Sequence, residues 1–424
     1  MSENASNMSG DPSILTGNLA AQNLDIANLP EWSLLMGEGI ASSPEAAQTT
    51  IDNAAEARRT ELSLKCLTYL HEGGDENYQK LTVAQGEAVR LSHEEFEELG
   101  GWFRHAMPDE SSYQTMQYIM LIHDAGKNSQ LVDEMGIDHQ VIDHDEVLDQ
   151  LLNAPEYIEQ RQAILPTFSS LSEPDQRLVQ NVFSVKLNFS QFLQAEVPAV
   201  ALEGVPKDLD EKSKTAYIMH AVLDIAGATG HLNPDSSPVL TSSMYKSMVA
   251  ARAALTDKKY IDADERYNAY LARRAEQFGI NARNLPKHSA EIRLACMLRC
   301  ASPEEFDDFA HALTHEVGSA DQSVLFKELS RNGVTDRARL PYYGPALLRA
   351  VTEKSNLPTA LKYFALTMYR AVMADYDNFG VDAEHGMVTV DLGDLTKYIN
   401  QTGEEPLPRF KRIGNKLVSV VQED

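Results

Sequence analysis

Residues 113–127 read YQTMQYIMLIHDAGK, and this stretch decides the fold class. Its apolar side chains recur at the three- and four-residue spacing of a helix that buries one face, which predicts a helix up to the His-Asp pair. Gly126 ends that helix, and Lys127 then stands where a cation can meet an anion. Because imidazole and carboxylate at one helix end can bind a metal ion, the stretch is also a candidate site.

The helical period continues on both sides of this stretch. Ser92, with acidic residues behind it, predicts a helix start, and Pro108 ends that helix. Further helices are expected over residues 145–152, 174–196, 212–226, 242–255, 263–278, 290–298, 303–316 and 345–352. Strand-like alternation becomes clear in 387–392 and 416–422, which predicts a small terminal β-hairpin. We therefore expect an all-α protein with a helical core, a helical C-terminal region and this hairpin.

The length of 424 residues is about three times the common domain size, so more than one domain is expected. Residues 1–50 are rich in Ser, Asn, Ala and Gly, contain no Lys or Arg, and lack sustained periodicity. We interpret residues 1–55 as a flexible N-terminal arm in which 29–36 forms a docked turn. Residues 56–260 are then expected to form a metal-binding helical domain, and residues 261–424 a helical C-terminal domain.

Composition excludes several classes of function. The chain has 63 acidic and 37 basic residues, and its net charge of -26 repels phosphate backbones and anionic lipid surfaces. We therefore expect no duplex nucleic acid and no membrane as partner, whereas a small phosphorylated substrate fits if a metal ion inverts the local field. The sequence has no apolar run of ~20 residues and no basic and apolar leader. Its three cysteines are too few for a disulfide framework, so a cytoplasmic protein is expected.

Histidines are unevenly placed, because five of the twelve lie between residues 93 and 144. The string His123-Asp124-Ala125-Gly126-Lys127 resembles the signature of the HD superfamily of metal-dependent phosphohydrolases. It is closest to the His-Asp-x-Gly-Lys form found in HD-GYP phosphodiesterases and inositol oxygenases. The resemblance covers about residues 60–260 and implies an HD-like all-α core holding one or two divalent ions, Mn, Mg, Fe or Zn. The Gly-Tyr-Pro element that names the HD-GYP group is missing, so its specialised activity is not implied.

The resemblance implies roles for individual residues. His123 and Asp124 match the central ligand pair, and Lys127 matches the lysine that contacts substrate phosphate. Asp224 is the best candidate for the distant ligand, because a carboxylate in an apolar helical run needs a cationic partner. His220 lies four residues earlier on the same helix face, so a hydrogen bond between His220 and Asp224 is the structural alternative.

Two further ligands are expected from the resemblance. His144, at a helix entrance, is the preferred interstitial histidine, and His139 is its weaker rival. For the first histidine, an antiparallel pairing of the helices before and after residue 109 favours His93 over His105, because His105 would be displaced by some 13 Å along the axis. Glu97 is level with the site but is a different ligand type, and a missing ligand stays open as well.

The expected function is that of a metal-dependent phosphohydrolase acting on a phosphoester or nucleotide. His123, Asp124, Asp224 and His144 hold the divalent metal ion in this interpretation, and Lys127 stabilises the charge that develops on phosphate. Two alternatives stay open. One is an HD-type di-iron oxygenase that uses the same ligands, and the other is a non-catalytic helical interaction protein with a degenerate HD-like site.

Three other patterns are given structural interpretations. Cys296 and Cys300 share one helix face and are expected to be core thiols. His311 and His315 are expected on a surface helix, since they lack the order of a zinc protease motif. The run 341–345, Pro-Tyr-Tyr-Gly-Pro, is interpreted as a turn packed on its own domain rather than as the lining of a cleft.

Overall fold

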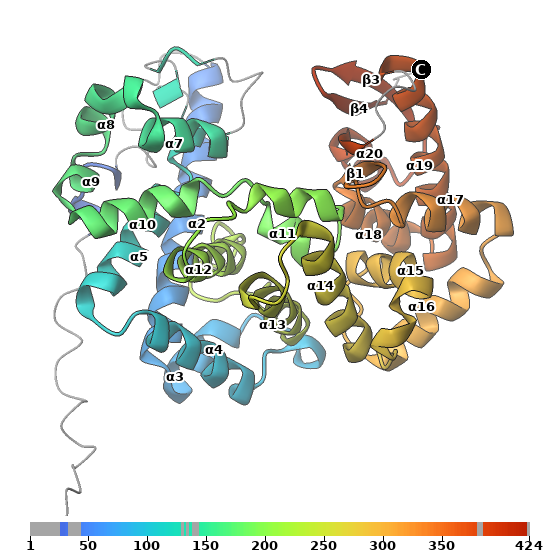
Figure 1. Ribbon diagram of the computed structural model, residues 1–424, viewed down its shortest axis with the longest axis horizontal. Coiled ribbons are helices and arrows are strands. Elements are labelled where there is room, and N and C mark those ends of the chain that lie inside the picture. The colour runs from blue at the N-terminus through green and yellow to red at the C-terminus, as the bar shows by residue number, and fades with distance from the viewer. Residues whose placement is uncertain are drawn as a thin grey trace, which may run out of the picture.

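The computed structural model describes residues 26–32, 44–128, 131–132, 135–137, 144–379 and 385–421. Helices dominate it, and one small sheet lies near the C-terminus (Figure 1). The prediction of a predominantly helical protein is thus confirmed. None of the helices in these ranges is long and apolar enough to cross a membrane.

The helices up to residue 256 are α2 (Pro44–Glu72), α3 (Gly74–Thr82), α4 (His93–Ala106), α5 (Glu110–Ile122), α7 (His144–Asn153), α8 (Ile158–Ile164), α9 (Pro166–Ser170), α10 (Glu173–Phe183), α11 (Phe189–Leu193), α12 (Glu211–Gly227) and α13 (Ser242–Thr256). The later helices are α14 (Ala263–Gln277), α15 (Leu285–Met297), α16 (Pro303–His315), α17 (Ser319–Leu329), α18 (Gly344–Lys354), α19 (Leu357–Phe379) and α20 (Gly393–Thr402). Short 3-10 helices are η3 (Ile26–Asn28), η4 (Glu87–Val89), η5 (Ala125–Lys127), η6 (Pro155–Tyr157), η7 (Ala199–Gly204) and η8 (Ala282–Asn284). The strands are β1 (Arg337–Tyr342), β2 (Gly386–Asp391), β3 (Arg409–Ile413) and β4 (Lys416–Val420).

Side-chain caps explain where several of these helices begin. Ser92 caps α4 in a capping box with Glu95, as its sequence predicts. Asp109 caps α5 in the same way, so that helix begins at Glu110, before the expected Tyr113. Helix α2 begins at Pro44, well before the boundary expected at residue 56.

Helices α2 and α12 form the centre of the first half and pack closely along each other (Figure 1). Gly227 permits this approach, because a Cβ there would lie 1.9 Å from Ser63 Oγ and 2.5 Å from the Arg59 carbonyl oxygen. Helices α4 and α5 both pack on α2, so the expected pairing of α4 with α5 is not the organising contact. This arrangement, rather than an α4–α5 hairpin, places the His-Asp pair at the end of α5.

The four-stranded sheet is larger than the predicted hairpin. Its order is β1-β2-β4-β3, in which β3 and β4 form the antiparallel hairpin and β2 pairs in parallel with β1 and β4. Strand β1 is unexpected because its buried Arg339 interrupts the apolar pattern. Ion pairs compensate that burial, with Arg339 Nη1 at 2.6 Å from Glu328 and Nη2 at 2.7 Å from Asp375.

The smaller structural expectations can also be compared with the fold. Within the expected turn 29–36, the described residues dock on the body: Glu31 is buried and accepts hydrogen bonds from Thr167 and Tyr118. Residues 33–36 and most of the expected arm lie outside the described residues. The cysteines on and after α15 are buried free thiols, as predicted. Both histidines near the end of α16, His311 and His315, are exposed, also as predicted.

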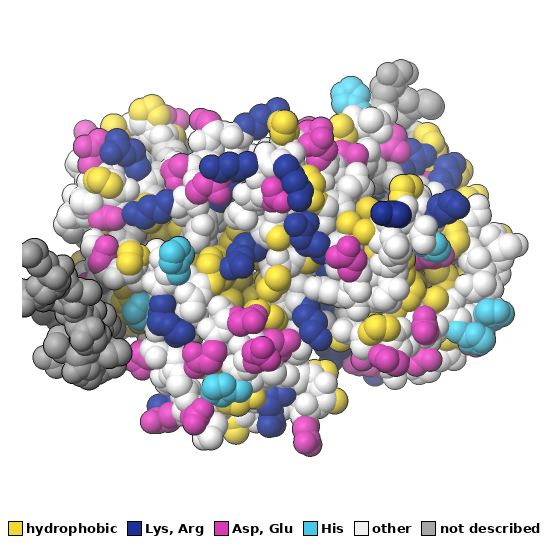
Figure 2. Space-filling model, turned by 60° about the horizontal axis from the view of Figure 1, so that its bottom comes forward, with side chains coloured by type: hydrophobic (Ala, Val, Ile, Leu, Met, Phe, Trp, Pro, Cys, Tyr) yellow, Lys and Arg dark blue, Asp and Glu magenta, His cyan; other side chains and the backbone are white. Residues whose placement is uncertain are grey.

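The surface charge is mixed on the face that Figure 2 shows. Lys and Arg side chains alternate there with Asp and Glu, without a continuous basic patch among the residues described. Charged side chains of both signs are therefore interspersed on that face.

Candidate functional site

The His-Asp pair lies where α5 ends, and the fold buries both side chains. Residues 115–122 of α5 are buried without interruption, so the helix carries His123 and Asp124 into the interior. His123 and Asp124 are 5% and 6% exposed, which is unusual for ionisable residues and requires partners. After them η5 turns the chain, with the Lys127 amide donating to the Asp124 carbonyl oxygen at 3.0 Å.

The imidazole of His123 is oriented by the backbone and faces two carboxylates. Its Nδ1 lies 2.6 Å from the Met120 carbonyl oxygen, which can only accept, so Nδ1 carries a proton. The other nitrogen, Nε2, lies 3.4 Å from Asp124 Oδ2 and 3.5 Å from Asp224 Oδ1. Burial alone would lower the pKa of His123, but the two carboxylates outweigh it and raise this pKa to about 9.

Lys127 of η5 and two residues of α2 supply the remaining charges. Lys127 Nζ lies 2.8 Å from both Asp124 Oδ1 and Glu56 Oε2, and Arg59 is paired with Glu56 on the same helix. Burial opposes ionisation of Asp124, yet His123 and Lys127 hold its pKa well below the usual range. We call this group the His123 cluster and define it as Glu56, Arg59, His123, Asp124, Lys127 and Asp224.

The formal charges of the His123 cluster balance. Its members Glu56, Asp124 and Asp224 are acidic, and Arg59, Lys127 and protonated His123 are basic. A cation bound at Nε2 of His123 would therefore replace the imidazolium proton rather than fill an uncompensated negative site.

His220 lies beside the cluster and has an unusual environment. Its ring centroid is 5.6 Å from that of His123 and 5.5 Å from that of Phe183. Both ring nitrogens are buried and have no hydrogen-bond partner among the described residues. Burial, followed by the nearby charge of His123, lowers the pKa of His220 to about 4, so the ring is neutral. Asp224 pairs with His123 instead of forming the hydrogen bond with His220 that the sequence left as the structural alternative.

The backbone at His144 lies against the loop after Asp124. A Cβ on Gly126 would lie 2.0 Å from the His144 carbonyl oxygen, so only glycine fits there. The His144 imidazole is directed at Asp145, with Nε2 3.2 Å from Oδ1. Gly126 thus permits the close approach to α7. It does not end the helix as expected, because α5 ends at Ile122 and Gly126 lies within η5. His139, the weaker rival, lies outside the described residues.

None of the candidates for the first histidine reaches the His123 cluster. His93 Nε2 lies 2.9 Å from Asp75 at the start of α3, and Glu97 accepts from the Gly74 amide at 2.9 Å. Both contacts lie beyond the C-terminal end of α2, about 24 Å along the helix axis from Glu56 at 1.5 Å per residue. His105 lines a separate cavity beside Glu211, at the start of α12.

Glu56 and Arg59 belong to α2 and form one side of the cluster. The sequence did not identify either of them as a site residue. An acidic and a basic residue three positions apart are common on exposed helices, so this spacing carries no specific signal. Only the packing of α2 against α12 and η5 shows that Glu56 and Arg59 face a buried His-Asp pair.

Metal binding by the cluster can be assessed from its donors. Among the residues that the structure describes, no three His, Cys, Asp or Glu side chains already form a group that could hold a metal ion. The pairwise distances from Nε2 of 3.4 and 3.5 Å nevertheless match the ~3.4 Å between two ligands bound at ~2.1 Å with a tetrahedral angle. With Nδ1 committed to Met120 and both nitrogens of His220 unpartnered, the residues fit a divalent ion in donor type.

Comparison with known proteins places the chain in a family without assigning an activity. Residues 41–402 match the model of a family of unknown function, DUF6829, and the chain belongs to that family. No curated protein matches it, and no solved structure does.

Proposed function

We propose that this protein is a metal-dependent phosphohydrolase that acts on a small phosphoester or nucleotide. The observation that supports the proposal is the convergence of Asp124 and Asp224, distant in sequence, on one nitrogen of His123. His123, Asp124 and Asp224 would hold a divalent ion, with His220 close enough to contribute through a ring nitrogen. When bound, such an ion supplies a Lewis acid and lowers the pKa of a coordinated water.

The residues of this chain would orient and neutralise the substrate. Met120 fixes the tautomer of His123 so that Nε2 faces the two carboxylates. Lys127, now bridging Asp124 and Glu56, would exchange a carboxylate contact for a phosphate oxygen and stabilise its developing charge. Arg59 would then retain Glu56 as its partner, which keeps the displaced carboxylate compensated.

The first experiment measures bound metal and hydrolysis together. Purified protein is analysed for Mn, Mg, Fe and Zn and assayed with a phosphomonoester and a phosphodiester of p-nitrophenol. We expect one bound metal species in the wild type. Asp124→Asn should no longer bind the metal, and its turnover should be lower by at least about 10³-fold. Asp235→Asn is the matched control, because Asp235 is an exposed carboxylate paired with Lys65. Bound iron without hydrolysis would instead support the oxygenase alternative.

A second experiment tests the role of Lys127. Lys127→Gln should retain metal and lower turnover by roughly 10² to 10³. The same change leaves buried Asp124 less compensated and should also reduce stability by about 1–3 kcal/mol. Glu56→Gln combined with Lys127→Gln leaves Asp124 equally under-compensated and also removes the partner of Arg59, so stability and turnover should both stay low. Full turnover in the metal-loaded single variant would eliminate the catalytic role of Lys127.

A non-catalytic cluster is the second candidate, and one observation favours it. Lys127 and Arg59 are already paired with carboxylates, and α2 presents Glu56 and Arg59 toward the His-Asp pair instead of a histidine. In that case the protein would bind none of the four metals, hydrolyse neither substrate, and show only the stability changes of the Lys127 variants.

A further inference from the structure

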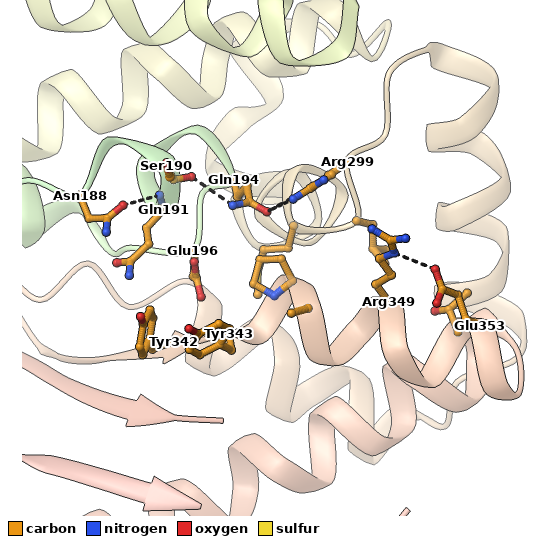
Figure 3. Close-up of a pocket in the computed structure, with 15 residues that line it drawn as sticks. Asn188, Ser190, Gln191, Gln194, Glu196, Arg299, Tyr342, Tyr343, Arg349 and Glu353 are labelled. Carbon is orange, nitrogen blue, oxygen red and sulfur yellow. Dashed lines mark hydrogen bonds and ion pairs between the residues drawn. The ribbon is translucent and has the colours of Figure 1, made fainter. Parts of the chain in front are cut away.

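A cavity of about 580 Å³ lies away from the His123 cluster, between α11, the end of α15 and the start of α18 (Figure 3). No member of the cluster lines it. Its volume is within the range of small-molecule sites. The cavity joins segments from both sides of the domain boundary expected at residue 260, which is a common place for a ligand site.

Backbone strain within the described chain concentrates at this cavity. The non-glycine residues with positive φ are Ala195, Arg299 and Tyr343, at 50°, 60° and 68°. Arg299 and Tyr343 line the cavity, and Ala195 directly precedes another lining residue, Glu196. Left-handed conformations of this kind persist only where the surroundings hold them, and they gather at ligand sites.

A fully buried arginine holds one wall in the strained conformation. Arg293 of α15 is 2% exposed, and its guanidinium donates to the carbonyl oxygens of Ala195 at 3.1 Å and Glu196 at 3.1 Å. It also donates to the carbonyl oxygens of Val197 and Leu329, at 3.3 and 2.6 Å. With its charge committed to backbone atoms, Arg293 braces the segment that carries Glu196.

The chemistry of the lining differs from end to end. Figure 3 shows Arg299 and Arg349 at one end of the cavity, and Tyr342 with Asn188 and Gln191 toward the other. Between them, the buried carboxyl group of Glu196 accepts from the Gly344 amide at 3.3 Å.

The arginine end can accept an anion. Both hydrogen bonds of Arg299 go to the neutral Oε1 of Gln194, from Nε and Nη2 at 3.3 Å each. Arg349 pairs with Glu353 at 2.7 Å and remains exposed. The two guanidinium groups and the single carboxylate of Glu353 leave a local positive charge at this end of the cavity. Guanidinium groups bind phosphate through paired hydrogen bonds.

The tyrosine end can accept a planar ring. The rings of Tyr342 and Tyr343 lie 4.4 Å apart, and Tyr343 is 45% exposed despite its size. The amide side chains of Asn188 and Gln191 lie on the opposite wall, where they can donate to and accept from the edge of a heterocycle.

We propose that this cavity binds a mononucleotide, with its phosphate between Arg299 and Arg349 and its base against Tyr343. The site is independent of the proposed phosphohydrolase activity, because none of its residues belongs to the His123 cluster. The run 341–345, interpreted from sequence as a turn packed on its own domain, supplies this aromatic wall.

Isothermal titration calorimetry on the full chain tests the proposal, in EDTA so that metal-dependent binding is suppressed. The probes are 5′-AMP and 5′-GMP, compared with adenosine, which lacks the phosphate, and ribose 5-phosphate, which lacks the base. We expect at least one nucleotide to bind about 10-fold or more tightly than either fragment.

Matched variants locate the binding. Arg299→Gln and Arg349→Gln should each weaken nucleotide binding about 10-fold or more, because each removes a charge-assisted contact at an exposed position. Arg177→Gln should leave binding unchanged, since Arg177 forms an exposed ion pair with Glu173 at the same four-residue spacing as Arg349 with Glu353. Circular dichroism verifies that all three variants fold.

Three results would overturn the proposal. The first is no binding of either nucleotide at about 1 mM, the weak end of specific affinities. The second is equal affinity in the Arg299, Arg349 and Arg177 variants. The third is binding lost in Lys127→Gln but retained in Arg299→Gln, which would move the ligand to the His123 cluster.

Discussion

The His123 cluster and the cavity at α18 differ in how their charged groups are paired and in how much open volume lies beside those groups. In the cluster, the buried His123 and Asp124 already have charged partners at 2.8 to 3.5 Å. In the cavity, one guanidinium is hydrogen-bonded only to a neutral amide among the contacts described, and the backbone is strained around open volume. A sequence motif can thus identify reactive groups, whereas space for a ligand emerges only from the packing of distant segments.

The two regions also differ in what supports them. In the cluster, removing a charged partner of His123 or Asp124 leaves a buried charge without compensation. At the cavity, Arg299 and Arg349 are exposed, and the support comes from the buried Arg293 behind the wall. The following variants test this difference, beginning with the largest expected effect.

Arg293→Met should be the most destabilising change. It leaves four backbone carbonyl oxygens without their donor, so we expect a loss of about 3–5 kcal/mol in the free energy of unfolding, measured by urea denaturation. Arg273→Met is the control, because Arg273 donates to a single carbonyl oxygen in its own helix and should cost less than about 1 kcal/mol. If Arg293→Met lowered the free energy of unfolding no more than Arg273→Met does, Arg293 would not be needed to hold the strained wall of the cavity.

Glu196→Gln should change the pH dependence of stability. Burial raises the pKa of Glu196 to about 8, despite the opposing backbone amides of Gly344 and Tyr343 and the charge of Arg293. The folded state keeps this proton between about pH 5 and 8 while the unfolded state loses it, so stability falls as pH rises through that window.

Between pH 5 and 9, the free energy of unfolding of the wild type should fall by about 2–4 kcal/mol because of Glu196. This loss should be absent in Glu196→Gln. Denaturation curves at several pH values measure it. Glu203→Gln, at an exposed position in η7, should retain the wild-type dependence. Parallel pH profiles for the wild type and Glu196→Gln would contradict the assignment.

His220→Phe should separate stability from metal binding at the cluster. Without metal, the change removes two unpartnered buried nitrogens, so stability should stay equal or rise by up to about 1 kcal/mol. Metal affinity should fall about 10-fold if His220 contributes a ligand nitrogen. His71→Phe provides the contrast, because His71 hydrogen-bonds the backbone of Met107 and should lose stability. Unchanged metal affinity in His220→Phe would remove His220 from the ligand set.

The smallest effect is expected at Tyr343, where two substitutions isolate backbone strain. Tyr343→Ala and Tyr343→Gly both remove the ring, but only glycine adopts φ of 68° without steric cost. We expect the Gly variant to be more stable than the Ala variant by about 0.5–1 kcal/mol in thermal unfolding, with weakened nucleotide binding in both. Equal stability of the two variants would mean that the left-handed conformation stores no strain.

Sequence reasoning was most successful where a local pattern determines the structure. Periodicity predicted many of the helices, and the Ser92 cap predicted the start of α4. The expected helix 174–196 is divided into α10 and α11, and α17, α19 and α20 were not predicted. The link between His123 and Asp224 was also anticipated, because a carboxylate in an apolar helix needs a cationic partner. Whether these residues bind metal stays a prediction.

Other features depend on contacts between segments that carry no local signal. The role of Glu56 depends on how α2 packs, and the burial of Arg339 depends on acidic partners in α17 and α19. Likewise, the cavity combines α11, α15 and α18, so the aromatic run 341–345 could not be recognised as its wall from sequence alone. Long-range packing decided each of these cases.

The order of strands in the small sheet has a consequence for synthesis on the ribosome. Strand β2 lies between β1 and β4, yet β4 is the last strand along the chain. One edge of β2 therefore remains open until residues 416–420 have left the exit tunnel, and the hairpin β3–β4 lies beyond the residues that match the family model. During translation this nascent edge can pair with a chaperone or with a neighbouring nascent chain.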